Sequence, residues 1–169
     1  MEGTKKFLVK GFYMIAVMVM FLVGAADKAC AATASVVIPA AEFTDDGFGA
    51  SYTKSFSGGY LGGTDDSPCL VAPVKIPGNA TKINKLIVYL IDDGTGAGDP
   101  LFQLTAIDMT TAFAEDYVNS EVADGTDVIQ AIEVPLLKQK VVKGRVYQLG
   151  TCLYGGQYLY GVKVLYTVP

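Results

Sequence analysis

The sequence of 169 residues contains no histidine. Ser-His-Asp and Cys-His nucleophilic sites, histidine-based zinc sites and acid–base catalysis by histidine are therefore excluded. Catalysis by two carboxylates remains open, because a glycosidase needs no other ionisable group, but nothing selects one pair among the seventeen acidic residues. We therefore predict that the protein is not an enzyme and name no catalytic residue; a carboxylate-based hydrolase is the less favoured alternative.

Three acidic turns are the best candidates for a bound cation, and calcium would be the ion, since it takes six to eight oxygen ligands from loop carboxylates and carbonyls. None has the EF-hand spacing. Asp92, Asp93 and Asp99 are our metal candidates, because they bracket one loop. Asp-Gly is also common in hairpin turns, so the simpler interpretation is that these turns are solvated and that no cofactor binds. The turns are Asp45-Asp46-Gly47, Asp65-Asp66-Ser67 and Asp92-Asp93-Gly94.

Tyrosine residues gather near the C-terminus, and a tyrosine ring can stack on the apolar face of a sugar while its hydroxyl group bonds outward. By strand alternation we expect Tyr158, Tyr160 and Tyr166 on the face that carries Val162 and Val164, where they would pack in the core. Tyr154, in a glycine-rich turn, is then our candidate for an exposed ligand contact. The chain has no tryptophan, which weakens the case for carbohydrate binding. The C-terminal tyrosines are Tyr147, Tyr154, Tyr158, Tyr160 and Tyr166.

Residues 1–31 have the layout of a secretory signal peptide. Three lysines, Lys5, Lys6 and Lys10, precede an apolar block from Phe12 to Ala26, which is shorter than the ~20 residues of a membrane-spanning helix. Small residues suitable for cleavage follow this block. An uncleaved anchor is an alternative, and lipidation of Cys30 is disfavoured because Asp27 stands where a lipobox needs an apolar residue. We predict a protein that is secreted, extracellular or periplasmic, with no stable membrane anchor after cleavage.

Export places the two remaining cysteines, Cys69 and Cys152, in an oxidising compartment, so we predict a disulfide between them. The bond would close a loop of ~83 residues and contribute about 4 kcal/mol to stability in the chain-entropy model. Two buried free thiols are the alternative.

Removal of residues 1–31 leaves nine basic and fifteen acidic residues, a net charge of −6. Nucleic acids and anionic membranes are bound by basic surfaces, so we expect no nucleic-acid partner.

The residues around Cys69–Gly94 predict the architecture that would hold these side chains. A short apolar strand, a turn at Pro77-Gly78-Asn79 and a strand from Ile83 to Ile91 follow one another. The last strand is apolar on both faces from Leu86 to Ile91, as in a central strand. A buried helix is the alternative for this segment. About seven to nine short strands with Gly, Pro and Asp turns occupy residues 32–169. We predict one all-β domain, an antiparallel β-sandwich with a jelly-roll-like form, preceded by an N-terminal signal-peptide helix.

Two segments resemble a diffuse group of uncharacterised exported bacterial β-sandwich proteins. One is the corner Ala72-Pro73-Val74-Lys75-Ile76-Pro77, which matches an APVxxP pattern, and the other is Gly161-Val162-Lys163-Val164-Leu165-Tyr166-Thr167, which matches a C-terminal GV[RK][IV]xYT strand. The resemblance implies export and a β-sandwich, and implies no catalytic residue.

We therefore expect a binding or cell-surface structural module. A glycan ligand, bound through tyrosine with calcium as a candidate cofactor, is one form of this hypothesis. Self-association is the other: residues Ala34 to Ile38 could be donated as a strand to a neighbouring copy, although the same residues could form an ordinary edge strand of their own domain.

Overall fold

The structure is a computed structural model that describes residues 31–47, 51–55, 59–64, 67–95, 98–122 and 126–169. The predicted signal peptide, apart from Ala31, and the turn at Asp65-Asp66 lie outside these residues. Residues 32–169 form one compact unit. Among the described residues, no helix has the length and hydrophobicity needed to cross a bilayer.

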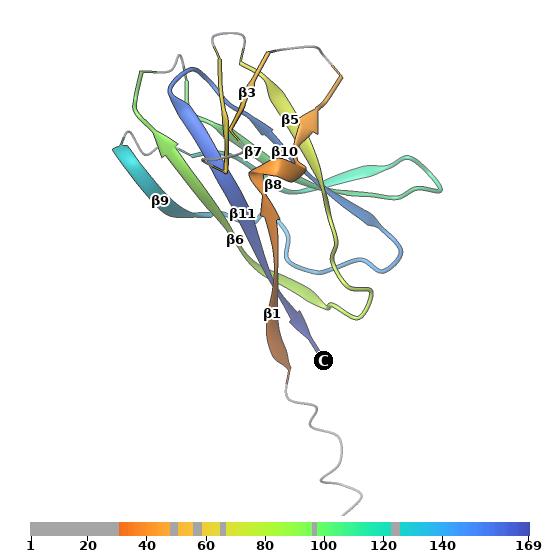
Figure 1. The fold of residues 1–169 in the computed structure, drawn as a ribbon. Helices are drawn as coiled ribbons and strands as arrows, with labels where there is room; N and C mark the ends of the chain where they lie inside the picture. The colour runs from red at the N-terminus through yellow and green to blue at the C-terminus, as the bar shows by residue number, and fades with distance from the viewer. Residues whose placement is uncertain (1–30, 48–50, 56–58, 65–66, 96–97, 123–125) are drawn as a thin grey trace, which may run out of the picture. The chain divides into compact units, whose positions relative to one another are not determined.

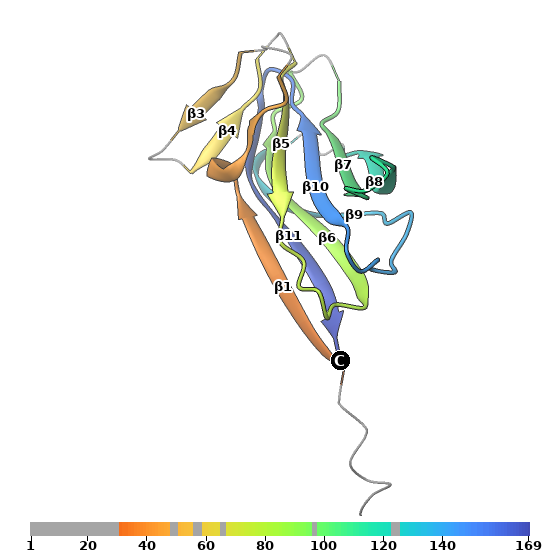
Figure 2. The same cartoon turned by 90° about the vertical axis from the view of Figure 1, so that its right-hand side faces the viewer.

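Two antiparallel sheets make up this unit, which confirms the predicted β-sandwich (Figures 1 and 2). Sheet A has the order β3-β4-β11-β6-β9, with β1 also paired to β11, and sheet B has the order β2-β5-β10-β7-β8. A single 3₁₀ turn, η1 (Ala40–Glu42), joins β1 to β2. The strands are β1 (Ala32–Pro39), β2 (Thr44–Asp45), β3 (Thr53–Ser55), β4 (Tyr60–Gly62), β5 (Cys69–Val74), β6 (Lys82–Asp92), β7 (Leu101–Ile107), β8 (Ala114–Glu121), β9 (Thr126–Val134), β10 (Val146–Cys152) and β11 (Gln157–Val168).

The central strand predicted from Ile83 to Ile91 is confirmed as β6, which lies between β11 and β9. Its even-numbered residues from Leu86 to Leu90 are buried between the sheets, and the odd-numbered residues from Ile87 to Ile91 are half-buried on the outer face. On the facing sheet, Phe102, Leu104 and Ala106 of β7 are fully buried. The two inward faces therefore meet in one hydrophobic core.

The structure also defines two segments around the edge of sheet B. β8 begins at Ala114 and pairs with β7, so Ala114 to Asp116 are extended and not helical. Residues 136–142 cross from β9 to β10 without joining either sheet as a strand. This crossing segment is held by backbone bonds, from Ile83 N to the Gln139 carbonyl oxygen and from Val141 N to the Thr81 carbonyl oxygen.

The disulfide between Cys69 and Cys152 is present, as predicted. The two residues face each other directly in the β5–β10 pair, with their Cα atoms 4.0 Å apart. The loop that the bond closes contains β6 to β9, which belong to both sheets. One covalent link therefore restrains most of the sandwich.

The predicted donor segment, Ala34 to Ile38, lies within β1. This strand pairs antiparallel with β11 of the same chain over eight residues, and Ile38 is buried in the core. The structure thus describes the ordinary edge strand that was the alternative to strand donation.

Candidate functional site: the tyrosine surface of sheet A

The faces predicted for β11 are wrong in its first half, because the strand carries a β-bulge. The register against β6 shifts between Leu159 and Gly161, and a bulge adds one residue, which reverses the side-chain alternation beyond it. Leu159 is therefore in the core together with Val162 and Val164, whereas Tyr158 and Tyr160 turn outward and are half-buried. A strictly alternating pattern placed both tyrosines in the core because it takes no account of an extra residue in the strand.

The bulge brings Tyr158 and Tyr160 beside a third tyrosine on the outer face of sheet A. The ring of Tyr60, on β4, lies with its centroid 5.3 Å from that of Tyr158 in an edge-to-face arrangement and 5.6 Å from that of Tyr160. Tyr89 of β6 is on the same face, opposite Gly161 in the register. We call these four residues the tyrosine surface: Tyr60, Tyr89, Tyr158 and Tyr160.

Glycines make room for this surface. Gly62 pairs with Tyr158 across the β4–β11 ladder, and a Cβ atom at Gly62 would lie 3.3 Å from the Tyr158 ring. At the bulge, a Cβ atom at Gly161 would lie 2.9 Å from the carbonyl oxygen of Ile38. Gly62 thus lets the Tyr158 ring lie close to β4, and Gly161 lets β1 approach β11 closely.

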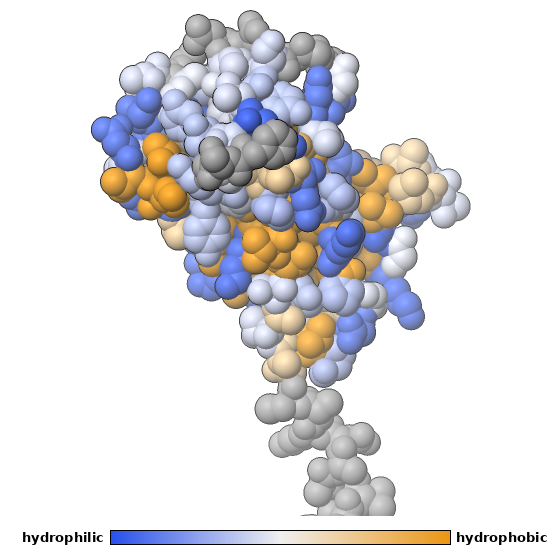
Figure 3. Space-filling view, viewed as in Figure 1, coloured by the Kyte–Doolittle hydropathy of each residue, from blue (hydrophilic) through white to orange (hydrophobic). Residues whose placement is uncertain are grey.

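The outer face around the tyrosine surface is mixed in character. Hydrophobic residues gather near the middle of the face on which β1 and β11 lie in the foreground, with hydrophilic residues around them (Figure 3). On this face, Val37 is 59% exposed and stands opposite Lys163, and Lys85 forms an exposed ion pair with Glu133. Such a face offers both ring stacking and hydrogen bonding to a polar ligand.

Tyr154, the contact predicted from the sequence, lies elsewhere. It is half-buried in the turn before β11, and a Cβ atom at Gly98 would lie 3.1 Å from its ring. The turn is fixed by Gln157, which is fully buried: its Oε1 accepts from Tyr154 N at 2.7 Å and its Nε2 donates to the Gly98 carbonyl oxygen at 2.7 Å. Tyr154 therefore packs the loop that follows β6 against the start of β11.

The structure does not gather the three predicted metal ligands into one group; among the described residues, no three acidic or cysteine side chains are close enough to hold a metal ion. Asp92 is buried, and its Oδ1 accepts from Gly94 N. Asp93 accepts from the backbone and the hydroxyl group of Thr95, and Asp99 is exposed. Calcium binding at these residues stays a prediction, which a rise in melting temperature with Ca²⁺ that is lost in Asp92→Asn would support.

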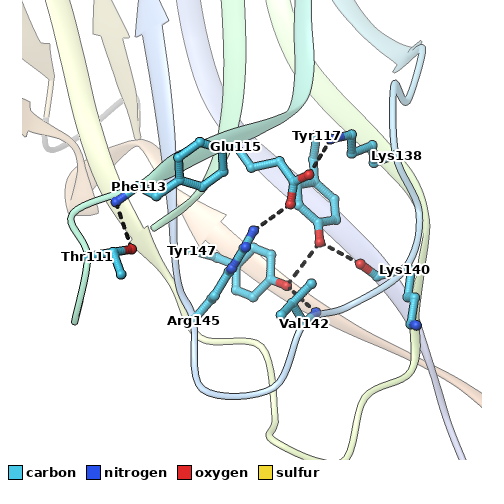
Figure 4. A network of polar contacts seen from close by, with 9 residues as sticks. All are labelled: Thr111, Phe113, Glu115, Tyr117, Lys138, Lys140, Val142, Arg145 and Tyr147. Carbon is cyan, nitrogen blue, oxygen red and sulfur yellow. Dashed lines mark hydrogen bonds and ion pairs between the residues drawn. The ribbon is translucent and has the colours of Figure 1, made fainter. Parts of the chain in front are cut away.

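A polar network at the edge of sheet B is the other concentration of charged groups (Figure 4). The Glu115 carboxylate on β8 accepts hydrogen bonds from Lys138 and Arg145. The hydroxyl group of Tyr117 donates to the Lys140 carbonyl oxygen, and that of Tyr147 accepts from Val142 N at 2.9 Å. The network fastens the crossing segment to β8, so its role is structural.

The ionisation of Glu115 in this network, and of Asp93 outside it, gives no support to acid catalysis. Hydrogen bonds from Lys138 and then Arg145 lower the pKa of Glu115, and those from Thr95 lower the pKa of Asp93. A general acid needs the opposite, a carboxyl group whose pKa is raised. Burial, reinforced by the hydrogen bond with Tyr147, raises the pKa of Tyr117 and keeps its phenol neutral.

No family model matches the chain. No curated protein matches it either. Among solved structures, it is similar to the C-terminal CBM6 of LamC, a marine laminarinase from Zobellia galactanivorans, with 15% identity, a TM-score of 0.46 and coverage of 78% of this chain and 98% of that one. It is also similar to the xylan-binding module CBM15, with 13% identity, a TM-score of 0.46 and coverage of 81% and 97%.

A third similar structure is the GH26-CBM35 β-(1,4)-mannanase of Podospora anserina, at 15% identity and a TM-score of 0.44; the match covers 80% of this chain but 28% of the mannanase. At TM-scores below 0.5 and identities of 15% or less, these three likenesses identify neither a family nor a ligand. The function has to be argued from the residues of this chain.

Proposed function

We propose that the protein is a non-catalytic binding module whose tyrosine surface takes a neutral glycan. The observation that carries the proposal is that the Tyr60 ring contacts the rings of both Tyr158 and Tyr160 on the outer face of sheet A. Tyrosine at a half-exposed site combines an apolar ring face with a hydroxyl group that reaches solvent. Sugars present the matching combination of apolar C–H faces and hydroxyl groups.

The surroundings favour a neutral ligand. The sequence from residue 32 onward has a net charge of −6, which repels polyanions. Of the basic side chains on this face, Lys85 is paired with Glu133. A ligand without strong charge would meet no electrostatic penalty here.

Two properties of the chain support export to a compartment where polysaccharides occur. The first is the signal-like sequence of residues 1–31. The second is the disulfide between Cys69 and Cys152, a bond that forms and persists in oxidising compartments. N-terminal sequencing of the exported protein tests this part of the proposal: a mature chain that starts near residue 32 is expected, and an intact Met1 would contradict it.

Affinity electrophoresis in gels that contain soluble xylan, galactomannan or laminarin tests the glycan proposal. We expect retardation in at least one gel, and Tyr158→Ala and Tyr160→Ala should each weaken binding about fivefold, the effect of a ring contact worth about 1 kcal/mol. Tyr160→Phe keeps the ring and should lose less affinity.

Tyr154→Ala is the control for the position of the site, because Tyr154 lies outside the tyrosine surface and should leave retardation unchanged. Loss of binding in Tyr154→Ala with full binding in Tyr158→Ala and Tyr160→Ala would move the site to the turn before β11. No retardation of the folded protein in any gel would contradict glycan binding by these three polymers.

A further inference from the structure

Gly150 is a glycine that the fold does not require. It lies in the middle of β10, a strand flanked on both sides by β5 and β7, and its φ is not in the left-handed region. Apart from its two chain neighbours, a Cβ atom there would come no nearer than 3.8 Å to another residue, an ordinary contact. Glycine inside a strand costs stability and often marks a place where a ligand approaches closely.

The other strand glycines in the described part of the chain differ from Gly150. Added Cβ atoms at Gly62 and Gly161 would lie 3.3 Å from a ring and 2.9 Å from a backbone oxygen, respectively. Packing explains those two glycines, but it does not explain Gly150.

What the missing side chain leaves is space on the outer face of sheet B. A hollow of about 220 Å³ lies there, with Val71, Leu101, Gln103 and the Cys69–Cys152 disulfide around Gly150. A second hollow of about 240 Å³ lies beside it, lined by Pro73, Val146 and Gln148 among others.

The two hollows follow one direction along the sheet. Gly150 stands opposite Val71, and Gln148 stands opposite Pro73, in the next outward-facing row of the β5–β10 pair. Two residues along a strand span about 7 Å. Each hollow is smaller than the 300–1,000 Å³ of a pocket for a drug-sized ligand. Each therefore suits one small ring, and a chain of such rings could occupy both hollows.

We propose that this groove is a second binding site, distinct from the tyrosine surface, which takes consecutive rings of a neutral saccharide chain. Its floor is apolar, formed by Val71, Leu101 and the disulfide. Carboxamides stand over the floor: Gln103, whose Nε2 donates to Asp116 Oδ1 at 3.1 Å, and Gln148, whose side chain has no hydrogen-bond partner among the described residues. The carboxamide oxygens of these two glutamines can accept hydrogen bonds from ligand hydroxyl groups.

A peptide strand is a poor occupant of the groove. The backbone of β10 is already paired with both neighbours, and Pro73 on β5 has no N–H to offer to an added strand. Asp46 at the first hollow and Asp116 next to Gln103 make an anionic ligand unfavourable. A polyhydroxylated ring with an apolar face meets neither obstacle.

Gly150→Val tests the site, because it fills the first hollow with a side chain that favours strands. We expect the midpoint of urea unfolding to be equal to or higher than that of the wild type. A lower midpoint would show that the fold needs this glycine, and would overturn the argument.

Binding is followed in ¹⁵N-labelled protein by chemical-shift changes on addition of xylohexaose, mannohexaose or laminarihexaose. We expect the amide signals of Val71, Gln148 and Gly150 to shift. The dissociation constant obtained from these shifts should rise at least tenfold in Gly150→Val and stay unchanged in the Tyr158→Ala/Tyr160→Ala double variant. Gln148→Ala, which leaves the first hollow open, should also raise this dissociation constant. Ser35→Val is the matched control: it adds a β-branched side chain to the outer face of the other sheet and should change nothing.

The outcomes separate the two sites. Absence of shifts in β5 and β10 with all three hexasaccharides, or shifts unchanged by Gly150→Val, would overturn the second site and leave the tyrosine surface untouched. Shifts in β5 and β10 without any in β4 or β11 would support the groove and contradict the proposed function of the tyrosine surface.

Discussion

At the level of single residues, Thr151 is unusual because its hydroxyl group is buried and has no hydrogen-bond partner in the part of the chain that the structure describes. The residue lies in β10 and is 2% exposed. A buried hydroxyl group that gives up its bonds to water without replacing them costs free energy. Thr151 therefore lowers the stability of the sandwich.

We predict that Thr151→Val raises the free energy of unfolding by about 1 kcal/mol, since valine keeps the β-branched shape and removes the desolvation cost. Equilibrium unfolding in urea measures the change. Thr105→Val is the control, because the Thr105 hydroxyl group donates to Asp116 Oδ1 at 3.0 Å, and this variant should lose stability. Equal effects of the two substitutions would show that the Thr151 hydroxyl group is satisfied in solution.

At the level of elements, the strands were predictable where one simple pattern governs a segment. The apolar run from Leu86 to Ile91 predicted a central strand, and Pro77-Gly78-Asn79 predicted a turn, in which Ala80 N donates to the Pro77 carbonyl oxygen. The tyrosine surface was not predictable in this way. It depends on one inserted residue in β11 and on the pairing of β11 with β4, a three-residue strand that lies far from β11 in the sequence.

The bulge in β11 gives a prediction about Gly161. An added methyl group would lie 2.9 Å from the carbonyl oxygen of Ile38, so β1 or β11 would have to move. We predict that Gly161→Ala lowers the free energy of unfolding by about 1–3 kcal/mol, the usual cost of overpacking. Thermal unfolding would measure this loss, with Gly78→Ala as the control, since nothing lies within 4 Å of a Cβ atom at Gly78. Unchanged stability of Gly161→Ala would mean that β1 is not held closely against the bulge.

The crossing segment depends on the ionised form of Glu115. The pKa of this carboxyl group is lowered in the folded protein, from an ordinary value of 4.5, by Lys138 and Arg145. Because the folded pKa lies below the unfolded one, the stabilisation is complete above about pH 4.5 and is lost as the pH falls through the folded pKa. We predict that Glu115→Gln is less stable than the wild type at pH 7 and that the difference narrows at pH 3.

Urea unfolding at the two pH values measures this difference, with Glu133→Gln as the control. Glu133 pairs with Lys85 in a more exposed position, where side chains are 57% and 49% accessible, and exposed ion pairs contribute little. If the free energies of unfolding of the wild type and Glu115→Gln differ by the same amount at pH 3 and pH 7, ionisation of Glu115 is excluded as the cause of the difference.

At the level of the whole molecule, the two surfaces that we propose as ligand sites differ in kind and lie on opposite sides of one core. Rings form the surface of sheet A, and the space left by a missing side chain forms that of sheet B. The β-bulge that turns two tyrosines outward and the glycine that leaves a hollow are both departures from regular strand patterns. Local rules of sequence describe the regular framework well and miss such departures, because each depends on which strands meet in the folded chain.

The disulfide links two neighbouring strands of sheet B, and its contribution to stability can be measured. It connects directly paired residues of β5 and β10 and closes a loop with a sequence separation of 83. In the chain-entropy model, such a loop restricts the unfolded chain enough to contribute about 4 kcal/mol to the free energy of unfolding.

We predict that the Cys69→Ala/Cys152→Ala double variant unfolds at a lower urea concentration, with a free energy of unfolding reduced by about 2–4 kcal/mol. Its denaturant slope should be steeper, because the uncrosslinked chain exposes more surface on unfolding. Wild-type protein unfolded in a reductant should give the same curve as the variant. An unfolding midpoint that is the same with and without reductant would show that the folded sheets, and not the covalent link, hold β5 and β10 together.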